Sequence, residues 1–480
     1  MPFEFVDNNA AIDRAARRRI RSHVATGKNV GRTLVRPSRA KADAQEVGPR
    51  PIAAIISVPH VVADTRNREV EEDGGCAIER MVGDGLSVFS FPEQGSIKTR
   101  RIVQSAFSFI SRPYQAADLQ TSIDTSELPT SMWIQFMFLD EAFFHIAIAT
   151  SVTARNGLVV EKDDPKEAMR HLSQTFRLIN ERLSGNDAVS DATIAVVVIL
   201  AQHERLRGHH QEGLVHVGGL ERMVQLRGGV MALSRYRPAL TQKMFKVDLE
   251  YALHQGTATR FSAEDIVPNS TAPFGRFNGL EINYDQDPTN MINCGLSKHL
   301  SISLQTVFAD MSSLARLMND ACAGRCPRIR PYIFLDTVIL LGYRLIQVSP
   351  LSGPRPLNHL ENAVHAGLAV YMMAFLRGLD MKATNVPLIS DLARSVAQEP
   401  VGSERVDREV ILWILFVGQT SAFGEADDEW LIPRMAETTR LLKIDSWEGV
   451  SKVLATFPWV NDVHGKSAQE LWYRSTFCEI

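Results

Sequence analysis

The residues best suited to metal chemistry lie in the segment QHERLRGHH, from Gln202 to His210. His203 and Glu204 begin like the helix of zinc proteases, in which a second histidine four residues after the first completes the ligand pair. Arg207 occupies that position here and would place a cation where a ligand is needed. A transition-metal site remains an alternative, because three further histidines lie nearby: His209, His210 and His216. We favour a polar helix end whose histidines face solvent.

Two other groups of residues could bind a metal ion. Cys322 and Cys326 are four residues apart, which is enough for half of a zinc site, but Cys76, Cys294 and Cys478 stand alone and offer no second pair. The acidic runs Asp427-Asp428-Glu429 and Asp163-Asp164 could recruit a divalent cation in an all-α enzyme. Both runs fall where helix N-caps are expected, and carboxylates there interact favourably with the helix dipole. We interpret them as caps.

No motif for nucleotide binding or nucleophilic catalysis is present. The chain has no Gly-x4-Gly-Lys-Ser/Thr loop, no Gly-x-Gly-x-x-Gly turn after a strand and no Gly-x-Ser-x-Gly elbow. We therefore expect neither an enzyme nor a cofactor, and an all-α enzyme with an acidic or histidine metal site remains the rival hypothesis.

The N-terminal region is strongly basic. Residues 1–50 carry 11 Lys and Arg against 5 acids, a net charge of +6, whereas the whole chain is −3 and the remainder is therefore −9. Four arginines fall within five residues: Arg17, Arg18, Arg19 and Arg21. Three roles fit this run: a nuclear import signal, non-specific contact with DNA phosphates, or a solvated helix surface. The region has few large apolar residues, so we predict a disordered arm.

The rest of the chain has the composition of a folded protein, with 45% apolar and 22% charged residues. Its apolar runs are far shorter than the roughly 20 residues of a membrane helix, and five scattered cysteines argue against a disulfide framework. We predict a basic arm over 1–50, a Pro-containing linker over 51–85 and an all-α body of ten or more helices over 86–480.

Helical periodicity supports this assignment. In the segment after Asp164, apolar residues recur every three or four positions from Met169 to Leu183, Pro165 suits the first helical position, and Gly185 suits the end. We predict a polar loop at about 264–293 and further helices over 131–150, 191–207, 214–226, 296–320, 334–348, 357–377, 406–423, 434–442 and 448–456.

The segment HVGGLERMVQLRGGVMAL (His216–Leu233) carries the most specific pattern in the chain. Gly228 and Gly229 follow a predicted helix end, where glycine allows the chain to turn, and Arg227 could bond the last carbonyls or an acid on a neighbouring helix. The pattern resembles the signature of the fungal-specific transcription factor domain, roughly His-x-x-Gly-Leu-x-x-Met-Val-x-Leu-Arg-Gly-Gly. Here its positions are filled by His216, Gly219, Leu220, Met223, Val224, Leu226, Arg227, Gly228 and Gly229.

Other segments resemble the same family in the same order along the chain. They are WIQFMFLDEAFFHIAIATSVTARNG before the signature, DLEYALHQGTATRF (Asp248–Phe261) after it, and LKIDSWEGVSKVLATFPWV (Leu442–Val460) near the C-terminus. The resemblance implies a helical regulatory domain in transcriptional control, located in the nucleus, with the cytoplasm as the alternative.

The chain departs from the family in one respect. Members read DNA through an N-terminal zinc cluster of six closely spaced cysteines, and the first cysteine here is the isolated Cys76. We therefore expect a regulator that acts through protein partners, among them other transcription factors or a second copy of itself, or through a small effector. Its own contact with DNA would be non-specific and made by the arm. A helical scaffold protein is a further alternative.

Overall fold

The computed structural model describes residues 103–104, 106, 119, 121–124, 132–158, 165–266, 276–277, 280–281, 296, 298–376, 386–400 and 402–477. By its internal contacts the chain divides into two units, Met1–Gly85 and Leu86–Ile480, and every described residue lies in the second. The arginines Arg17, Arg18, Arg19 and Arg21, the linker over 51–85 and the acids Asp163 and Asp164 lie outside the described residues.

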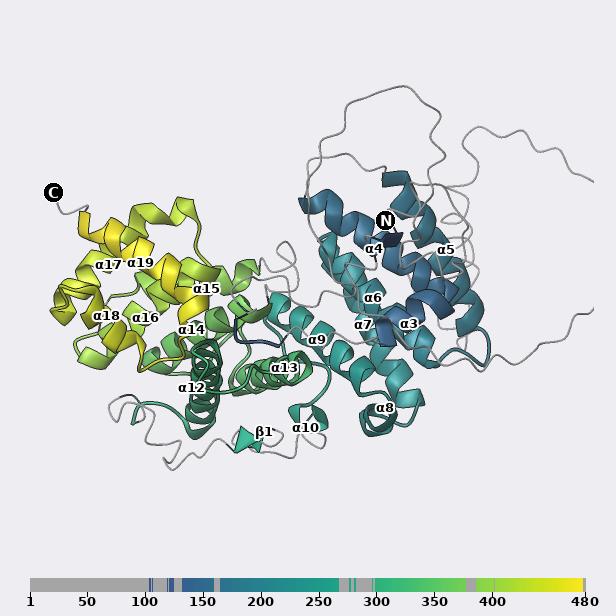
Figure 1. Cartoon of the computed structure of the whole chain (residues 1–480), viewed down its shortest axis with the longest axis horizontal. Helices are drawn as coiled ribbons and strands as arrows, with labels where there is room; N and C mark the ends of the chain where they lie inside the picture. Colours follow the sequence, from purple (N-terminus) through teal and green to yellow (C-terminus); the bar gives the residue numbers. More distant parts are fainter. Residues whose placement is uncertain are drawn as a thin grey trace, which may run out of the picture. The chain divides into compact units, whose positions relative to one another are not determined.

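The described part of the second unit is all-α, as the sequence predicted (Figure 1). Its first half comprises α3 (Met132–Leu139), α4 (Glu141–Leu158), α5 (Pro165–Leu183), α6 (Asp191–Leu206), α7 (His210–Leu226), α8 (Val230–Tyr236), α9 (Pro238–Gln255) and α10 (Ala263–Ile266). The two-residue strands β1 (Arg276–Phe277) and β2 (Leu280–Glu281) form a short antiparallel pair within the predicted polar loop.

The second half comprises α12 (Ile302–Cys322), α13 (Pro331–Val348), α14 (His359–Leu376), α15 (Pro387–Gln398), α16 (Arg405–Ser421), the 3₁₀ turn η5 (Glu425–Asp427), α17 (Asp428–Leu442), α18 (Trp447–Leu454) and α19 (Asn461–Phe477). Proline occupies the first turn of α9, α13 and α15, where its missing N–H costs nothing. Ser190 and Ser446 cap α6 and α18 by accepting bonds from Thr193 N and Gly449 N.

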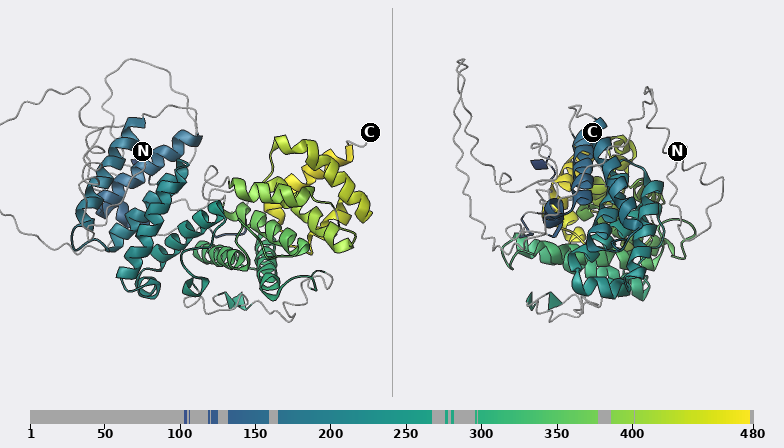
Figure 2. Two further views of the ribbon diagram at one scale, coloured as in Figure 1. Left: turned by 180° about the vertical axis from the view of Figure 1, so that it is seen from behind. Right: turned by 90° about the vertical axis from the view of Figure 1, so that its right-hand side faces the viewer.

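Helix α9 connects the two halves, because it packs against α6, α7 and α8 on one side and against α13 and α15 on the other (Figures 1 and 2). Thirteen of its eighteen residues are buried, including the charged Lys246, Asp248 and Glu250. Glu250 pairs with Lys246 and lies 3.2 Å from Arg205 on α6. Buried charges persist only when they are paired in this way. Asp248 accepts a 2.7 Å bond from the Tyr343 hydroxyl on α13.

The predicted helix over 131–150 is wrong in one respect, because two helices cover it. Asp140 interrupts the run: its carboxylate accepts a 2.8 Å bond from Phe143 N and pairs with Arg182 on α5 at 2.9 Å. An aspartate that caps a helix competes with the backbone for the same N–H groups and so separates α3 from α4. Met169, expected on the apolar stripe of α5, is exposed, whereas Leu172 and Ile179 are buried.

One described helix, α13, is long and apolar enough to cross a membrane by length and composition. Most of it is buried inside the protein, between α9, α12 and α14. An apolar core helix meets the same criteria of length and composition as a membrane-spanning one.

Candidate functional site

The signature segment His216–Gly229 forms most of α7 and the turn into α8. Gly229 has φ 90° and ψ 177°, a conformation that is essentially restricted to glycine, and its N–H bonds Val224 O at 2.9 Å. Gly228 also has a positive φ of 97°. The two glycines end α7 and reverse the chain so that α8 begins at once.

Arg227 fixes the end of α7 to the start of α6. Its guanidinium donates a 3.0 Å bond to Val189 O and forms an ion pair with Asp191, the first residue of α6. Arg237 pairs with the same carboxylate. Burial raises the pKa of Asp191, but the hydrogen bonds from Arg237 and Arg227 outweigh it and hold this pKa below its ordinary value. The arginine of the signature therefore joins two helices.

Four other signature side chains, those of His216, Leu220, Met223 and Val224, are buried in the helical bundle, whereas Leu226 is exposed. Leu220 is fully buried, and His216 is buried with its ring stacked 6.4 Å from that of Phe176 on α5. Burial lowers the pKa of His216 to about 4, so the ring is neutral at pH 7. Gly219 is different, because it lies on the exposed side of α7 and a side chain added there would meet nothing within 4 Å.

The histidines near α6 only partly fit the sequence interpretation, in which they face solvent: His209 is exposed and His210 is half-buried, whereas His203 and His216 are buried. His203 is buried, and burial together with the Arg207 charge lowers its pKa to about 3. Glu204 lies 3.1 Å from His209 and 3.9 Å from Arg207. His210 stacks on His254 of α9, with ring centroids 3.4 Å apart. Helix–helix packing, which a linear pattern does not contain, buried His203 and placed His210 against His254.

The acidic run at α17 is held by arginines. Asp427 accepts bonds of 2.7 and 3.1 Å from Arg394 and one of 2.9 Å from Gly424 N, and these bonds lower its pKa to about 2 against the effect of burial. Asp428 pairs with Arg474 on α19. The Cys322 thiol donates a hydrogen bond to Asp462 at 2.9 Å. This bond and burial both raise the pKa of the Cys322 thiol. Across the described residues, no three His, Cys, Asp or Glu side chains group so as to hold a metal ion.

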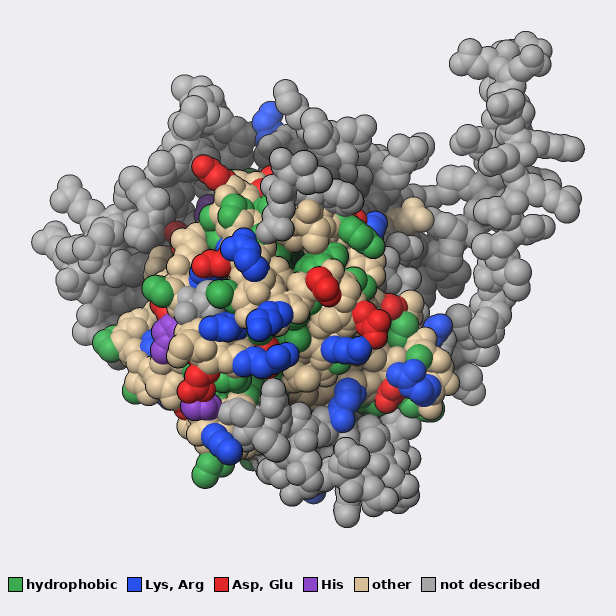
Figure 3. Space-filling model, turned by 90° about the vertical axis from the view of Figure 1, so that its left-hand side faces the viewer, with side chains coloured by type: hydrophobic (Ala, Val, Ile, Leu, Met, Phe, Trp, Pro, Cys, Tyr) green, Lys and Arg blue, Asp and Glu red, His purple; other side chains and the backbone are tan. Residues whose placement is uncertain are grey.

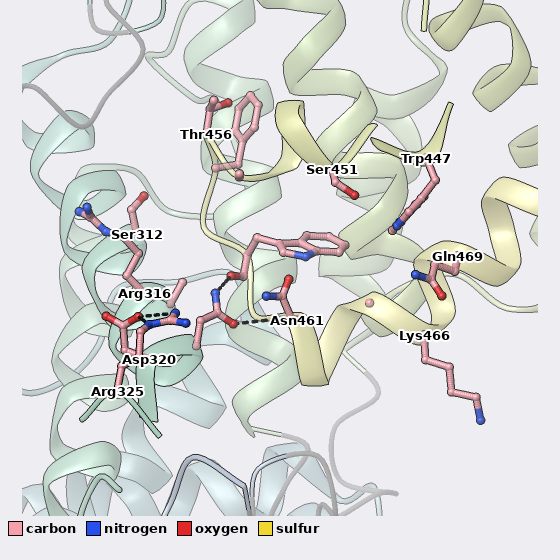
Figure 4. Close-up of a pocket in the computed structure, with 16 residues that line it drawn as sticks. Ser312, Arg316, Asp320, Arg325, Trp447, Ser451, Thr456, Asn461, Lys466 and Gln469 are labelled. Carbon is pink, nitrogen blue, oxygen red and sulfur yellow. Dashed lines mark hydrogen bonds and ion pairs between the residues drawn. The ribbon is translucent and has the colours of Figure 1, made fainter. Parts of the chain in front are cut away.

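A cavity of about 820 Å³ lies between α12, α18 and α19, within the size range of small-molecule sites (Figure 4). We call it the α12–α19 cavity. Its lining residues are Ser312, Ala315, Arg316, Asn319, Asp320, Arg325, Trp447, Ser451, Ala455, Thr456, Phe457, Trp459, Asn461, Gly465, Lys466 and Gln469.

The wall between α18 and α19 is held in place by hydrogen bonds and aromatic packing. Asn319 of α12 donates to Trp459 O at 2.8 Å and accepts from Asn461 N at 2.9 Å (Figure 4). Phe457 stacks on Trp413 of α16 with centroids 5.2 Å apart, and Trp413 Nε1 donates to Pro458 O at 3.1 Å. Phe457 and Trp459 of the Phe-Pro-Trp segment, which the sequence analysis identified only by its family resemblance, therefore line the cavity and are held by these contacts.

Several polar side chains of the cavity are not used by the fold. Among the described residues, no hydrogen bond reaches the side chains of Trp447, Trp459, Ser451, Asn461 or Gln469. On the α12 side, Arg325 pairs with Asp320 at 2.6 Å. Lys466 extends away from the other labelled residues in Figure 4. No pattern in the sequence indicated this site, because its residues come from segments up to 157 positions apart, from Ser312 to Gln469.

The surface around these C-terminal helices carries many cations. Figure 3 views the side on which α17, α18 and α19 lie and shows Lys and Arg side chains gathered across it. The exposed cations of α16 to α19 include Arg405, Arg440, Lys443, Lys452 and Lys466. These cations are interspersed with acids, because residues 405–477 carry eight Lys and Arg and eleven Asp and Glu.

No protein-family model, curated protein or solved structure matches the chain.

Proposed function

We propose that this chain is a transcription-regulator-like protein that acts through protein partners and a small effector, without a zinc cluster of its own for reading DNA. The observation that carries the proposal is the signature at His216–Gly229 and the use the fold makes of it. Arg227, Gly228 and Gly229 join α6, α7 and α8, and Leu220 enters the bundle. These residues hold the helices together, and the resemblance of the signature to the family supports the regulatory role.

The cysteines support the part of the proposal that concerns DNA. The 480 residues contain five, and the pair nearest in sequence, Cys322 and Cys326, lies at the end of α12 and just beyond it. A binuclear cluster of six thiolates cannot be built from these residues. We propose that a partner protein, another transcription factor, selects the DNA site. It binds either a single copy or a dimer of this chain.

The basic run of Arg17, Arg18, Arg19 and Arg21 supports a location in the nucleus. A compact set of arginines suits the acidic groove of an import receptor, and it would also contact phosphates without sequence preference.

The test is chromatin occupancy of the tagged full chain in its native cells, beside a variant in which these four arginines are changed to Ala. A matched control changes four exposed cations of the body to Ala: Arg405, Arg440, Lys443 and Lys452. We expect discrete promoter peaks for the wild type and the control, and none for the arm variant. A wild-type protein that stays cytoplasmic and gives no peaks would refute the proposal.

A third variant separates import from DNA contact. The arm variant is fused to an unrelated nuclear import signal. If the peaks return, the arginines serve import; if the protein enters the nucleus without peaks, they contact DNA.

A further inference from the structure

We propose that the α12–α19 cavity binds a neutral, fused heteroaromatic ring of the purine kind. This inference deepens the proposed function and rests on it in one respect, because the ligand would be the small effector. The binding itself is argued from the helix faces, the hydrogen-bonding groups and the charges that surround the cavity.

One face of α19 provides a platform for the ring. Asn461, Gly465 and Gln469 all line the cavity and follow one another at intervals of four residues, so they lie along the same side of the helix. Gly465 leaves the centre of this face open, because a Cβ added there meets nothing within 4 Å. At 1.5 Å per residue, the backbone positions of the two amides are about 12 Å apart. That span suits a fused bicyclic ring with a hydrogen bond at each end better than a single ring.

Helix α18 and the turn after it contribute flat apolar surfaces. The indoles of Trp447 and Trp459 both line the cavity, and each packs edge-on against Phe416 of α16, with ring centroids 6.0 and 6.4 Å apart. Ser451 and Ala455, one and two turns after Trp447, also line the cavity, and their small side chains leave space in front of the indoles. Indoles that neighbouring rings already hold lose little conformational entropy when a planar ring stacks on them.

The free polar groups match a ring edge that both donates and accepts hydrogen bonds. The amides of Asn461 and Gln469 each offer a carbonyl acceptor and an NH₂ donor, and the Ser451 hydroxyl can do either. An amide of this kind makes paired hydrogen bonds to an adenine edge, because that edge carries a donor next to an acceptor. In Figure 4 the Gln469 amide lies on the side of α19 that faces Trp447 and Ser451. A purine edge would therefore satisfy amides that the fold leaves unused.

The charges around the cavity favour a ligand without net charge. Its lining carries three cations and one acid, but Asp320 and Arg325 pair at 2.6 Å, Arg316 is engaged in an interaction of its own, and Lys466 extends away from the other labelled residues in Figure 4. Residues 405–477, which supply α18 and α19, carry eleven acids against eight Lys and Arg. This acidic excess disfavours an anion, and the cations of the lining disfavour a cation. A neutral ring is penalised by neither.

Two substitutions test these contacts without removing a bond that the fold uses. Gln469→Met keeps the length of the side chain and removes the amide, and an exposed glutamine of α7 gives its matched control, Gln211→Met. Gly465→Leu fills the open centre of the α19 face and raises helix propensity. Gly219→Leu is the control for this second variant, since Gly219 also lies within a helix, α7, with open space around it.

The experiment is calorimetric titration of the purified full chain with adenine and hypoxanthine. Quinoline, a flat fused ring without a donor–acceptor edge, is titrated beside them, as are adenosine and AMP. We expect saturable binding of adenine or hypoxanthine, roughly tenfold or more weaker binding of quinoline, and no tighter binding of AMP than of adenosine. Gln469→Met should weaken purine binding roughly tenfold. Gly465→Leu should abolish it with no fall in Tm, and both controls should leave it unchanged.

Four results would each overturn the inference: no saturable binding of either purine, equal binding of quinoline, tighter binding of AMP than of adenosine, or unchanged purine binding by Gln469→Met or by a folded Gly465→Leu protein. If Gly465→Leu does not fold, Gln469→Met decides alone. Because the titration needs no cells, its failure is distinct from the absence of promoter peaks, which bears on the proposed function alone.

Discussion

Replacing Gly229 by Ala tests whether the signature glycine is needed for backbone conformation alone. Gly229 adopts φ 90° and ψ 177°, and a Cβ placed there would meet nothing within 4 Å. The substitution therefore introduces no clash with a neighbouring side chain. Its only folded-state cost is that of holding an L-residue in a region that alanine rarely enters.

That cost is about 1–3 kcal/mol for one residue in such a region. Alanine also restricts the unfolded chain, but the gain of about 0.4–1 kcal/mol does not cancel the strain. We expect Gly229→Ala to lower the free energy of unfolding by about 1–2 kcal/mol. In a cooperative unit of roughly 150–250 residues, each kcal/mol lowers Tm by about 2–4 °C.

Gly219→Ala is the control within the same signature. Gly219 lies in the interior of α7, on its exposed side and with open space around it. Alanine is preferred over glycine there by about 1 kcal/mol, so this variant should be more stable than the wild type. Two glycines ten residues apart are thus expected to respond with opposite signs.

The assay is thermal unfolding of the purified full chain followed by circular dichroism, with both variants and the wild type run side by side. The reasoning is refuted if Gly229→Ala unfolds at or above the wild-type temperature, or if both variants shift in the same direction.

Two further predictions concern charged and titratable groups of the fold. Arg227 and Asp191 are partly buried, with 28% and 18% of their side chains exposed. A double-mutant cycle of Arg227→Ala, Asp191→Ala and the double variant, measured by urea unfolding, should therefore give a coupling free energy of about 1–2 kcal/mol. Additive effects of the two substitutions would contradict the pairing. Burial lowers the pKa of His464 to about 4, although its backbone bond to Val460 opposes this, and the pKa of an unfolded His is about 6.5. The unfolded state therefore binds more protons between these values, and the stability present above pH 6.5 is lost as the pH falls toward 4. His464→Phe removes the titrating group and therefore this loss. The difference in free energy of unfolding between variant and wild type, measured in urea, should favour the variant by about 1 kcal/mol more at pH 5.5 than at pH 7.5. Equal differences at the two pH values would contradict the assignment.

Local signals in the sequence were sufficient for many of the helices. The apolar spacing from Met169 to Leu183 predicted α5, although Met169 itself is exposed, and the glycines after Leu226 predicted the end of α7. Five of the described helices were not predicted: α8, α9, α10, α15 and α19. On α9 nearly every face is buried, so charged residues such as Lys246 and Glu250 interrupt the apolar pattern while being paired inside the protein. A stripe on one face cannot be detected where all faces are buried.

The sequence by itself determined the helical class and the turn at Gly228 and Gly229, because periodicity and positive-φ glycines act over a few residues. Only the tertiary structure decided where the polar side chains point. It turned His203 inward, held Asp427 with an arginine 33 residues away, and brought α12, α18 and α19 together around a cavity. These outcomes depend on which helices pack against each other, and that choice is made by side chains far apart in the chain, whose pairing no local spacing records.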